Sequence, residues 1–255
     1  MRIVIASTIV AMLIVAAAAY AAITPIPPAE YPPGCDQIRG TALRSDAESD
    51  TLFGTERSDL LIGGPGYDHL FGSDGGTFQP DCLFGQGDPD RLFGEHGHDF
   101  LAGGSGADTL AGGRDTDKLF GGAGDDSMGT GPGNRDRAFG GSGDDLIIGG
   151  TGPADTLFGN HGDDQVLAQG PQASLRGNPG DDQLTARAYG GIIFGGPGND
   201  KLTARNHATL EAGAGDDRIR DVHGPARINC GQGSDTVVTA TARRHLNACE
   251  RVIRP

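Results

Sequence analysis

The sequence predicts an all-β fold, a parallel β-helix of nine-residue repeats in which two short parallel sheets face each other across a thin core. Three observations lead to this prediction. Glycine supplies 45 of the 255 residues, far above the ~7% that is usual in proteins. Nearly all of this glycine lies between Gly54 and Gly233. Within that window, an aspartate followed two residues later by an apolar side chain recurs about every nine residues.

Composition and charge exclude several other classes of protein. Helices and central strands tolerate few glycines, so an ordinary helical or doubly wound enzyme is not expected. Collagen is excluded because glycine does not occupy every third position. The formal net charge is −14. Such an acid excess argues against a nucleic-acid partner and requires a compensating cation.

The N-terminal residues 1–21 are expected to be a signal peptide. Arg2 precedes an apolar run from Ile3 to Ile23, and Ala19-Tyr20-Ala21 has the form of a cleavage site. The run is also long enough to span a bilayer, so an uncleaved membrane anchor is the alternative. Either way we expect the rest of the chain outside the cytoplasm, either secreted or, if the leader is retained, at the cell surface. We expect no membrane insertion beyond the leader.

A proline-rich linker and a cysteine framework follow. Residues 22–34 contain the stretch TPIPPAEYPPG and are expected to form an extended linker. The four cysteines of an exported protein indicate two disulfides, for which three pairings are possible. Because two cysteines lie near each end of the repeat region, we favour the local pairing, Cys35 with Cys82 and Cys230 with Cys249.

The repeat region is expected to cover residues 35–238, with an N-terminal cap and irregular first turns in residues 35–82 and a C-terminal cap in residues 239–255. Each repeat would consist of a glycine-rich turn of six residues and a strand of three, and glycines permit the positive φ angles of such turns. Two repeats make one coil. The central residue of each strand would point inward, and these core positions are Leu52, Leu61, Leu70, Leu83, Leu92, Leu101, Leu110, Leu119, Met128, Ala138, Ile147, Leu157, Val166, Leu175, Leu184, Ile193, Leu202, Leu210, Ile219, Ile228 and Val237.

The fullest repeats carry the pattern Gly-Gly-x-Gly-x-Asp, at residues 63–68, 103–108, 121–126, 140–145 and 195–200. This pattern resembles the RTX, or hemolysin-type, calcium-binding nonapeptide. The resemblance covers about Asp50 to Val237 and implies a right-handed parallel β-roll with Ca²⁺ ions between stacked turns. It also implies that folding is coupled to calcium.

Alternate repeats lie on opposite edges of such a roll. Each turn aspartate is a candidate oxygen ligand for calcium, and carbonyl oxygens of the turns would complete each shell. We expect the stronger sites on the edge that keeps both its aspartate and its turn glycine: Asp68, Asp108, Asp126, Asp145, Asp164, Asp182, Asp200, Asp217 and Asp235. Weaker sites are expected at Asp90, Asp99, Asp117, Asp136 and Asp155. The second edge loses its aspartate halfway along, where Ala173, Gly191, Ala208 and Ala226 follow.

The sequence therefore predicts a secreted, monomeric calcium-binding protein without catalytic residues. One alternative is a cell-surface adhesin or structural spacer that calcium only rigidifies, with an unknown surface partner. A third hypothesis is a fragment of a toxin or enzyme that carries such repeats. The absence of a non-repeat domain argues against this hypothesis. Phenylalanine follows the core position in eight repeats, which we interpret as packing around the turns, with an exposed apolar strip for a partner as the alternative.

Overall fold

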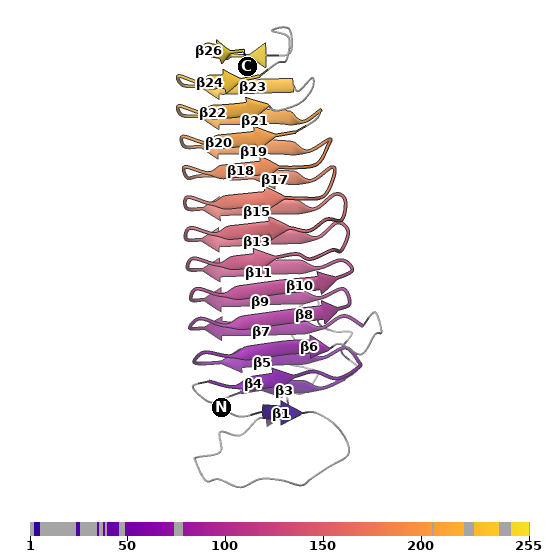
Figure 1. Cartoon of the computed structure of the whole chain (residues 1–255). Helices are drawn as coiled ribbons and strands as arrows, with labels where there is room; N and C mark the ends of the chain where they lie inside the picture. The colour runs from indigo at the N-terminus through magenta and orange to yellow at the C-terminus, as the bar shows by residue number, and fades with distance from the viewer. Residues whose placement is uncertain are drawn as a thin grey trace.

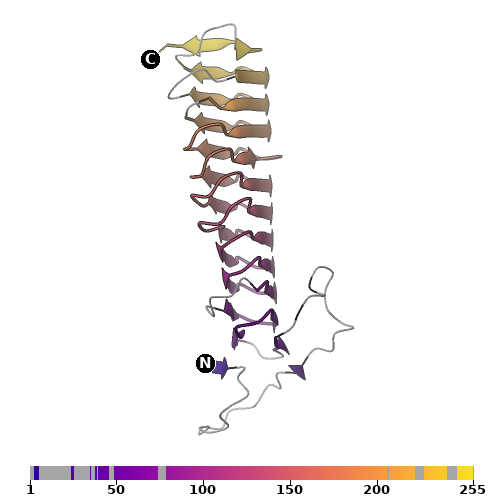
Figure 2. The same ribbon diagram turned by 90° about the vertical axis from the view of Figure 1, so that its right-hand side faces the viewer.

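A computed structural model describes residues 3–5, 24–25, 35, 38, 40–45, 49–73, 79–205, 207–221, 227–239 and 246–254. The described chain winds into a straight rod of flat coils stacked one on another (Figures 1 and 2). These residues form strands and turns only, and they confirm the predicted all-β fold with two parallel sheets. None of the described segments is a helix long and apolar enough to cross a membrane.

Thirteen strands form each sheet, and the two sheets lie on opposite sides of the rod. Sheet A has the order β1 (Ile3–Ile5), β4 (Thr51–Phe53), β6 (His69–Ser73), β8 (Arg91–His96), β10 (Thr109–Arg114), β12 (Ser127–Gly129), β14 (Leu146–Gly149), β16 (Gln165–Ala168), β18 (Gln183–Ala186), β20 (Lys201–Ala204), β22 (Arg218–Asp221), β24 (Thr236–Val238) and β26 (Arg251–Ile253). Sheet B has the order β2 (Thr24–Pro25), β3 (Ala42–Arg44), β5 (Leu60–Gly64), β7 (Cys82–Gly87), β9 (Phe100–Ser105), β11 (Lys118–Ala123), β13 (Arg137–Ser142), β15 (Thr156–His161), β17 (Ser174–Arg176), β19 (Ile192–Pro197), β21 (Thr209–Ala214), β23 (Arg227–Gln232) and β25 (Leu246–Asn247).

The register of the strands aligns identical positions of successive coils. Leu110 pairs with Leu92 on one side and Met128 on the other, and Leu119 pairs with Leu101 in the opposite sheet. All strand pairs are parallel except β2 with β3. The chain therefore moves up by one strand in the same sheet every two repeats, as predicted.

The core is a ladder of aliphatic side chains between the sheets. Every core position predicted from the sequence is at most 2% exposed. The residue two positions further along each strand also points inward, because side chains alternate between the faces of a strand. In most coils this second inward position is glycine or alanine, such as Gly140 or Ala186. That small residue leaves room beside the core for the turn aspartates.

A disulfide lies near each end of the rod. Cys35 is bonded to Cys82 and Cys230 to Cys249, which confirms the local pairing. At the N-terminal end, Cys35 and Ile38 pack over Leu60 and Ile62 in a small separate cluster. At the C-terminal end, β25 and β26 extend both sheets, so part of the expected cap forms a further coil.

Most of the expected signal peptide and linker, and the tip of the insertion before Asp81, lie outside the described residues. Of the leader, only β1 is described, and it pairs with β4.

The phenylalanines do not pack around the turns. Each follows an inward-facing core residue, so its ring lies on the outer face of a sheet and is half-buried. On sheet B, the ring centroids of Phe120 and Phe139 are 4.9 Å apart and those of Phe139 and Phe158 are 4.8 Å apart, in stacked geometry. Arg176 continues this row between Phe158 and Phe194. The rings are partly buried because they cover one another.

Candidate metal-binding site

Every repeat aspartate lies at the end of a turn, immediately before a strand, and its side chain points into the coil. We name the turns by edge. Edge one joins each strand of sheet B to the next strand of sheet A. Its aspartates form the inner row: Asp50, Asp68, Asp90, Asp108, Asp126, Asp145, Asp164, Asp182, Asp200, Asp217 and Asp235. All are at most 4% exposed. Asp90, which we expected to be a weaker site, belongs to this row.

The edge-one turns repeat one backbone conformation in successive coils. In the turns leading to Asp68 and to every later aspartate of this row, the second and fourth residues have positive φ, for example Gly141 (φ 127°) and Gly143 (φ 124°). Only glycine adopts such angles without strain. In the turn that leads to Asp90, Gln86 (φ 86°) and Asp88 (φ 67°) replace glycine at these two positions and adopt the same region. Turn glycines therefore recur on this edge because its turns share one backbone geometry with positive φ angles.

The inner row is held by a continuous chain of hydrogen bonds. The backbone N–H of each aspartate donates to the Oδ1 atom of the aspartate one coil later, at 2.8 Å from Asp126 to Asp145 and 2.9 Å from Asp145 to Asp164. The row ends where the N–H of Asp235 donates to Oε2 of Glu250 at 2.9 Å. One oxygen of each carboxylate is therefore already the acceptor of a backbone N–H from the preceding coil.

The second oxygen of these carboxylates is buried without a hydrogen-bond partner. This holds for the Oδ2 atoms of Asp68, Asp90, Asp108, Asp126, Asp145, Asp164, Asp182, Asp200, Asp217 and Asp235. The ordinary cost of such an atom is about 1–3 kcal/mol, and more when it is charged. In the described part of the chain, these ten oxygens therefore share a geometry in which a cation could bind them.

The glycine at the inward position of many coils leaves room for these oxygens, because a side chain there would clash with them. A Cβ atom placed on Gly140 would lie 2.0 Å from Oδ2 of Asp145 and 2.5 Å from the carbonyl oxygen of Gly159. The same arrangement of carboxylate and carbonyl oxygen surrounds Gly85 and Gly121. A carboxylate oxygen and a carbonyl oxygen, the kinds of ligand that Ca²⁺ prefers, therefore both lie close to each of these glycines.

The first turns of the rod provide the contrast. There the carboxylates meet protein donors: the hydroxyl of Ser45 donates to Oδ2 of Asp50. Oδ2 of Asp59 accepts the N–H of Thr55 at 2.5 Å and its hydroxyl at 3.0 Å. Neither Asp50 nor Asp59 has an orphaned oxygen. The orphaned oxygens of edge one therefore begin at Asp68, after these first turns.

Burial changes the acidity of the inner row. Desolvation raises the pKa of Asp126, Asp164, Asp182 and Asp217 to about 7, and that of Asp68, Asp145 and Asp200 to about 6. Repulsion between neighbouring carboxylates adds to the rise in most of them, for example between Asp126 and Asp145. Ionised carboxylates in this row need a positive charge beside them.

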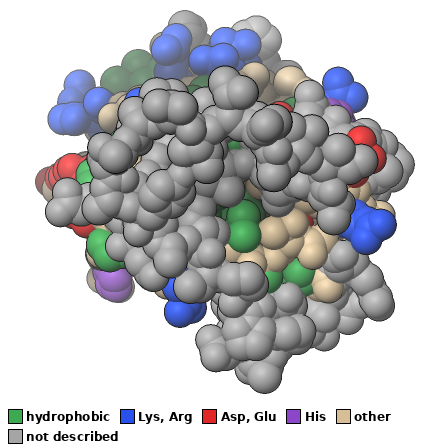
Figure 3. Space-filling view, turned by 90° about the horizontal axis from the view of Figure 1, so that it is seen from below, with side chains coloured by type: hydrophobic (Ala, Val, Ile, Leu, Met, Phe, Trp, Pro, Cys, Tyr) green, Lys and Arg blue, Asp and Glu red, His purple; other side chains and the backbone are tan. Residues whose placement is uncertain are grey.

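A second acidic row, which the sequence analysis did not identify, runs along the outside of edge one. It consists of the residues that precede the inner aspartates: Asp125, Asp144, Asp163, Asp181, Asn199 and Asp216. In this row the N–H of each later coil donates back to the preceding side chain, at 2.9 Å from Asp144 to Asp125 and 2.8 Å from Asp163 to Asp144. These side chains are exposed. In the end-on view of Figure 3, acidic side chains gather on the left, the side on which the edge-one turns lie in Figure 1.

Edge two carries a shorter row of the same kind: Asp59, Asp81, Asp99, Asp117, Asp136 and Asp155. The backbone N–H of Asp99 donates to Oδ1 of Asp117 at 2.9 Å. Burial raises the pKa of Asp99 to about 9 and that of Asp117 to about 8. Their Oδ2 atoms, like those of Asp136 and Asp155, have no hydrogen-bond partner. Edge two thus repeats the inner-row arrangement over its first half.

The structure confirms that edge two loses its carboxylates halfway along and shows what replaces them. Ala173 and Ala208 occupy aspartate positions, and Ala168, Ala186 and Ala204 occupy the inward positions that glycine holds in earlier coils. All five are buried. Methyl groups therefore fill the space that carboxylates and their partners fill elsewhere. Ala226 lies outside the described residues.

The turn geometry on edge two changes before the aspartates disappear. In the turns leading to Asp99 and Asp117, residues at the second and fourth turn positions have positive φ, as on edge one. In the turn leading to Asp136, Gly131 keeps its positive φ, but the second positive φ moves to Arg135, directly before the aspartate. In the turn leading to Asp155, Ala154 alone has positive φ. The carbonyl groups of the turn are therefore oriented differently at these two positions.

Side chains alone do not complete any of these sites. In the described part of the chain, no group of three or more His, Cys, Asp or Glu side chains converges on one point. The ligands on the inner row would be carboxylate oxygens combined with backbone carbonyls. That donor set fits calcium and does not fit zinc, which prefers nitrogen and sulfur ligands.

Comparison with protein families agrees with this geometry. The family model of the RTX calcium-binding nonapeptide repeat matches residues 45–78, 80–110, 102–135, 139–170 and 176–206, which is more than half of the chain. Searches of curated proteins and of solved structures find no match. On the strength of the matched repeats and of the coils that they form, this chain belongs to the family of RTX calcium-binding nonapeptide repeat proteins.

Proposed function

We propose that this protein is secreted and binds a stack of Ca²⁺ ions along the inner row of edge one, and that calcium binding drives its folding. The observation that carries the proposal is the row of orphaned Oδ2 atoms beside backbone carbonyls, at every coil from Asp68 to Asp235. A divalent cation in each gap would coordinate these oxygens and neutralise the repulsion between neighbouring coils.

Calcium binding would be coupled to folding because the small apolar core does little to hold the coils together. Each strand contributes one large aliphatic side chain to the core, and the second inward residue is mostly glycine or alanine. Burial of so little apolar surface offsets only part of the entropy of ordering a chain with 45 glycines. Ions that bind only the folded coils would add their binding free energy to its stability.

Weaker binding along the first half of edge two is part of the proposal. Asp99 and Asp117 combine an orphaned oxygen with the edge-one type of turn, so they are the best candidates on that edge. Asp136 and Asp155 lack that turn and would bind more weakly.

The decisive experiment is circular dichroism of the full chain in calcium and in excess chelator, with magnesium as the control cation. We expect the β-sheet signal to appear on addition of calcium and to disappear with chelator. Magnesium should not replace calcium, because it demands a smaller octahedral shell and gives up its water reluctantly. A β-sheet signal that is unchanged by chelation would refute calcium-coupled folding.

Export is supported by the two disulfides, one near each end of the rod, because such bonds persist in oxidising compartments. The intact mass of protein from the culture medium tests cleavage after residue 21. Recovery of the uncleaved chain from the membrane fraction would favour an anchored form.

A second function, that of a calcium-rigidified spacer or adhesin at the cell surface, is favoured by the straight rod of stacked coils in Figure 2. Its test is the maximum dimension of the particle in solution by small-angle X-ray scattering. A spacer that calcium merely stiffens would keep an extended β-rich shape without calcium, whereas calcium-coupled folding predicts an expanded disordered chain.

A further inference from the structure

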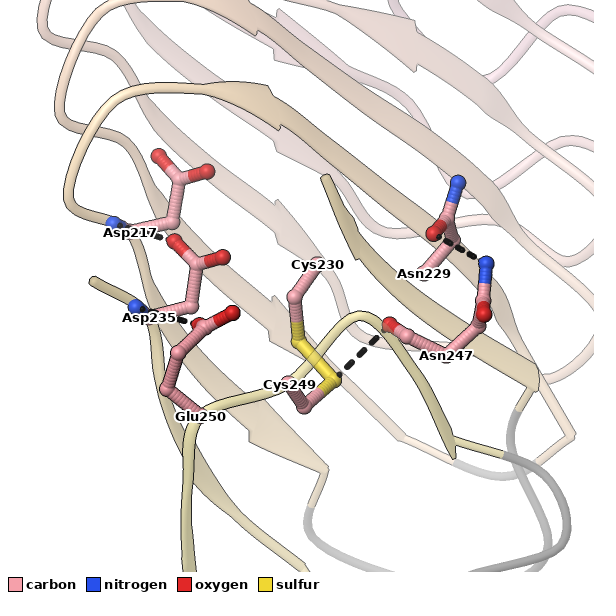
Figure 4. Close-up of a disulfide and its surroundings, with 7 residues drawn as sticks. All are labelled: Asp217, Asn229, Cys230, Asp235, Asn247, Cys249 and Glu250. Atoms are coloured by element: carbon pink, nitrogen blue, oxygen red, sulfur yellow. Dashed lines mark hydrogen bonds between the residues drawn. A yellow bond between two sulfur atoms is a disulfide. The ribbon is translucent and has the colours of Figure 1, made fainter. Parts of the chain in front are cut away.

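The inner row of edge one does not end with the last repeat. One coil beyond Asp235, the side chain of Glu250 takes the position of the next aspartate: its Oε2 accepts the N–H of Asp235 at 2.9 Å, as each Oδ1 does along the row. Figure 4 shows the carboxylates of Asp217, Asp235 and Glu250 one below another. Glu250 is outside the repeat pattern, so the nonapeptide does not identify it.

Asp235, the last aspartate of the inner row, has a carboxylate oxygen without a hydrogen-bond partner, as the aspartates before it do. Asp235 is fully buried, and its Oδ2 atom has no hydrogen-bond partner. Along the rest of the inner row, each such oxygen is followed by the carboxylate of the aspartate one coil later. Here Glu250 provides that carboxylate, and its side chain is exposed, so an ion can reach it from solution.

The cap reaches this position by a shorter path than a repeat does. Asp235 and Glu250 are 15 residues apart, whereas Asp217 and Asp235 are 18 apart. The cap turn from β25 to β26 consists of Ala248, Cys249 and Glu250 alone. The side chain of glutamate is one methylene longer than that of aspartate, which helps a shortened turn to reach the row.

The disulfide fixes the turn that carries Glu250. Cys230 occupies the inward position that Ala212 holds one coil earlier, and it is fully buried. Its partner Cys249 directly precedes Glu250. The bond therefore ties the backbone beside Glu250 to the inner face of the last repeat coil (Figure 4). Pairing of β26 with β24 holds the other side of the same residue.

We propose that Glu250 and Asp235 form a terminal calcium site that closes the inner row, and that the Cys230–Cys249 disulfide positions Glu250 for it. This inference rests on the proposed calcium binding of the row. Oδ2 of Asp235 supplies a ligand from the last repeat coil, and the Glu250 carboxylate supplies one from the cap. The C-terminal segment is then a functional part of the metal stack as well as a cover for its end.

Glu250→Gln tests the site without removing the cap. The glutamine amide oxygen still accepts the Asp235 N–H, so the hydrogen bond remains and only the charged ligand is lost. Glu211→Gln is the matched control, because Glu211 is exposed on the outer face of sheet B and is not part of either acidic row. A Cys230→Ser/Cys249→Ser double variant, which keeps the Cys35–Cys82 bond, tests the positioning role.

Two measurements on the full chain are needed: calcium bound per chain by equilibrium dialysis, and calcium positions by anomalous scattering from crystals grown in calcium. We expect a peak between Asp235 and Glu250 in the wild type. In Glu250→Gln this peak should vanish, with one calcium ion fewer per chain, while the peaks further along the row and those of Glu211→Gln remain. The double cysteine variant should lose or weaken the same peak although Glu250 is present.

The possible failures are distinguishable. A wild type that binds no calcium overturns both the proposed function and this inference. A wild type with calcium along the row but none between Asp235 and Glu250, or a Glu250→Gln variant with unchanged calcium content, overturns the terminal site alone. Loss of every peak in the double cysteine variant would show that the disulfide holds the fold in general, and would overturn its specific role in positioning Glu250.

Discussion

Replacing Asp145 with asparagine separates the charge of the inner row from its shape. Asparagine has nearly the same volume and keeps an oxygen that accepts the N–H of Asp126, now at 2.8 Å. Its NH₂ group takes the place of Oδ2, near Gly140, where the carbonyl oxygen of Gly159 also lies. The variant therefore removes the charge and one oxygen ligand and nearly keeps the shape of the side chain. The adjacent Asp144 is the control, because it is exposed in the outer row.

The variant should have effects of opposite sign with and without calcium. Burial raises the pKa of Asp145 from 3.8 to about 6, and two pKa units correspond to ~3 kcal/mol in favour of the neutral form. Without calcium at neutral pH, Asp145→Asn is thus expected to be no less folded than the wild type. With calcium at 100 times its Kd, loss of one ion removes ~2.7 kcal/mol of the free energy of unfolding.

Urea unfolding at a series of buffered free calcium concentrations measures this directly. Each ion released on unfolding makes the free energy of unfolding rise by ~1.4 kcal/mol per tenfold increase in calcium. Asp145→Asn should lower that slope by at least one ion, and Asp144→Asn should leave it unchanged. The reasoning is refuted if the two variants have the same slope, or if Asp145→Asn is destabilised equally at the lowest and the highest free calcium concentrations at which the chain is folded.

Three further predictions test the pH dependence, the turns and the outer faces. Folding raises the pKa of Asp99 to about 9 and that of Asp117 to about 8. Between their ordinary pKa and these values, the folded chain therefore binds more protons than the unfolded chain. The β-sheet signal of calcium-free protein should thus increase as the pH falls from about 8 to about 5. Calcium affinity should fall over the same range; circular dichroism and calcium titrations that show no pH dependence would contradict this. Gly162→Ala should destabilise the calcium form by several kcal/mol, because residue 162 has φ 124° and a Cβ would lie 2.0 Å from the carbonyl oxygen of Gly143. The control Gly129→Ala should be tolerated, because nothing lies within 4 Å of its Cβ. Equal urea midpoints for the two variants would refute the turn argument. Phe139→Ala removes two stacked contacts, at 4.9 and 4.8 Å, and should cost about 1–3 kcal/mol in urea unfolding without changing the calcium slope; a changed slope would assign this ring a role in the metal sites.

Much of the fold could be predicted because the repeat constrains it twice. The apolar residue two positions after each aspartate defines the core, and the glycine pattern defines the turns; both have the same period, so only a coil with two strands per turn satisfies them. The loss of carboxylates along edge two was also readable, since Ala173 and Ala208 replace aspartates in an unbroken register. The local disulfide pairing followed from the positions of the cysteines at the two ends of the repeats.

Other features depend on which residues the coils bring together. The expectation for the phenylalanines was wrong because a sequence shows that Phe120, Phe139 and Phe158 recur, but only parallel pairing in register stacks their rings on the outer face of sheet B. The outer row of edge one was visible as Asp-Asp pairs, yet its role as a backbone acceptor requires the next coil. The replacement of glycine by alanine at positions 168, 186 and 204 gained its meaning only when these methyl groups were found beside Ala173 and Ala208.

The sequence by itself determined the period, the core and the identity of the inner-row carboxylates, because each is a local property that recurs within one repeat. Only the tertiary structure decided which oxygen of each carboxylate is already used and which is orphaned, because the donor comes from a different coil. The same is true of Glu250, whose place in the row depends on a shortened turn and a disulfide outside the repeat pattern. Stacking converts a one-dimensional pattern into contacts between residues 15 to 22 positions apart, and those contacts define the metal stack.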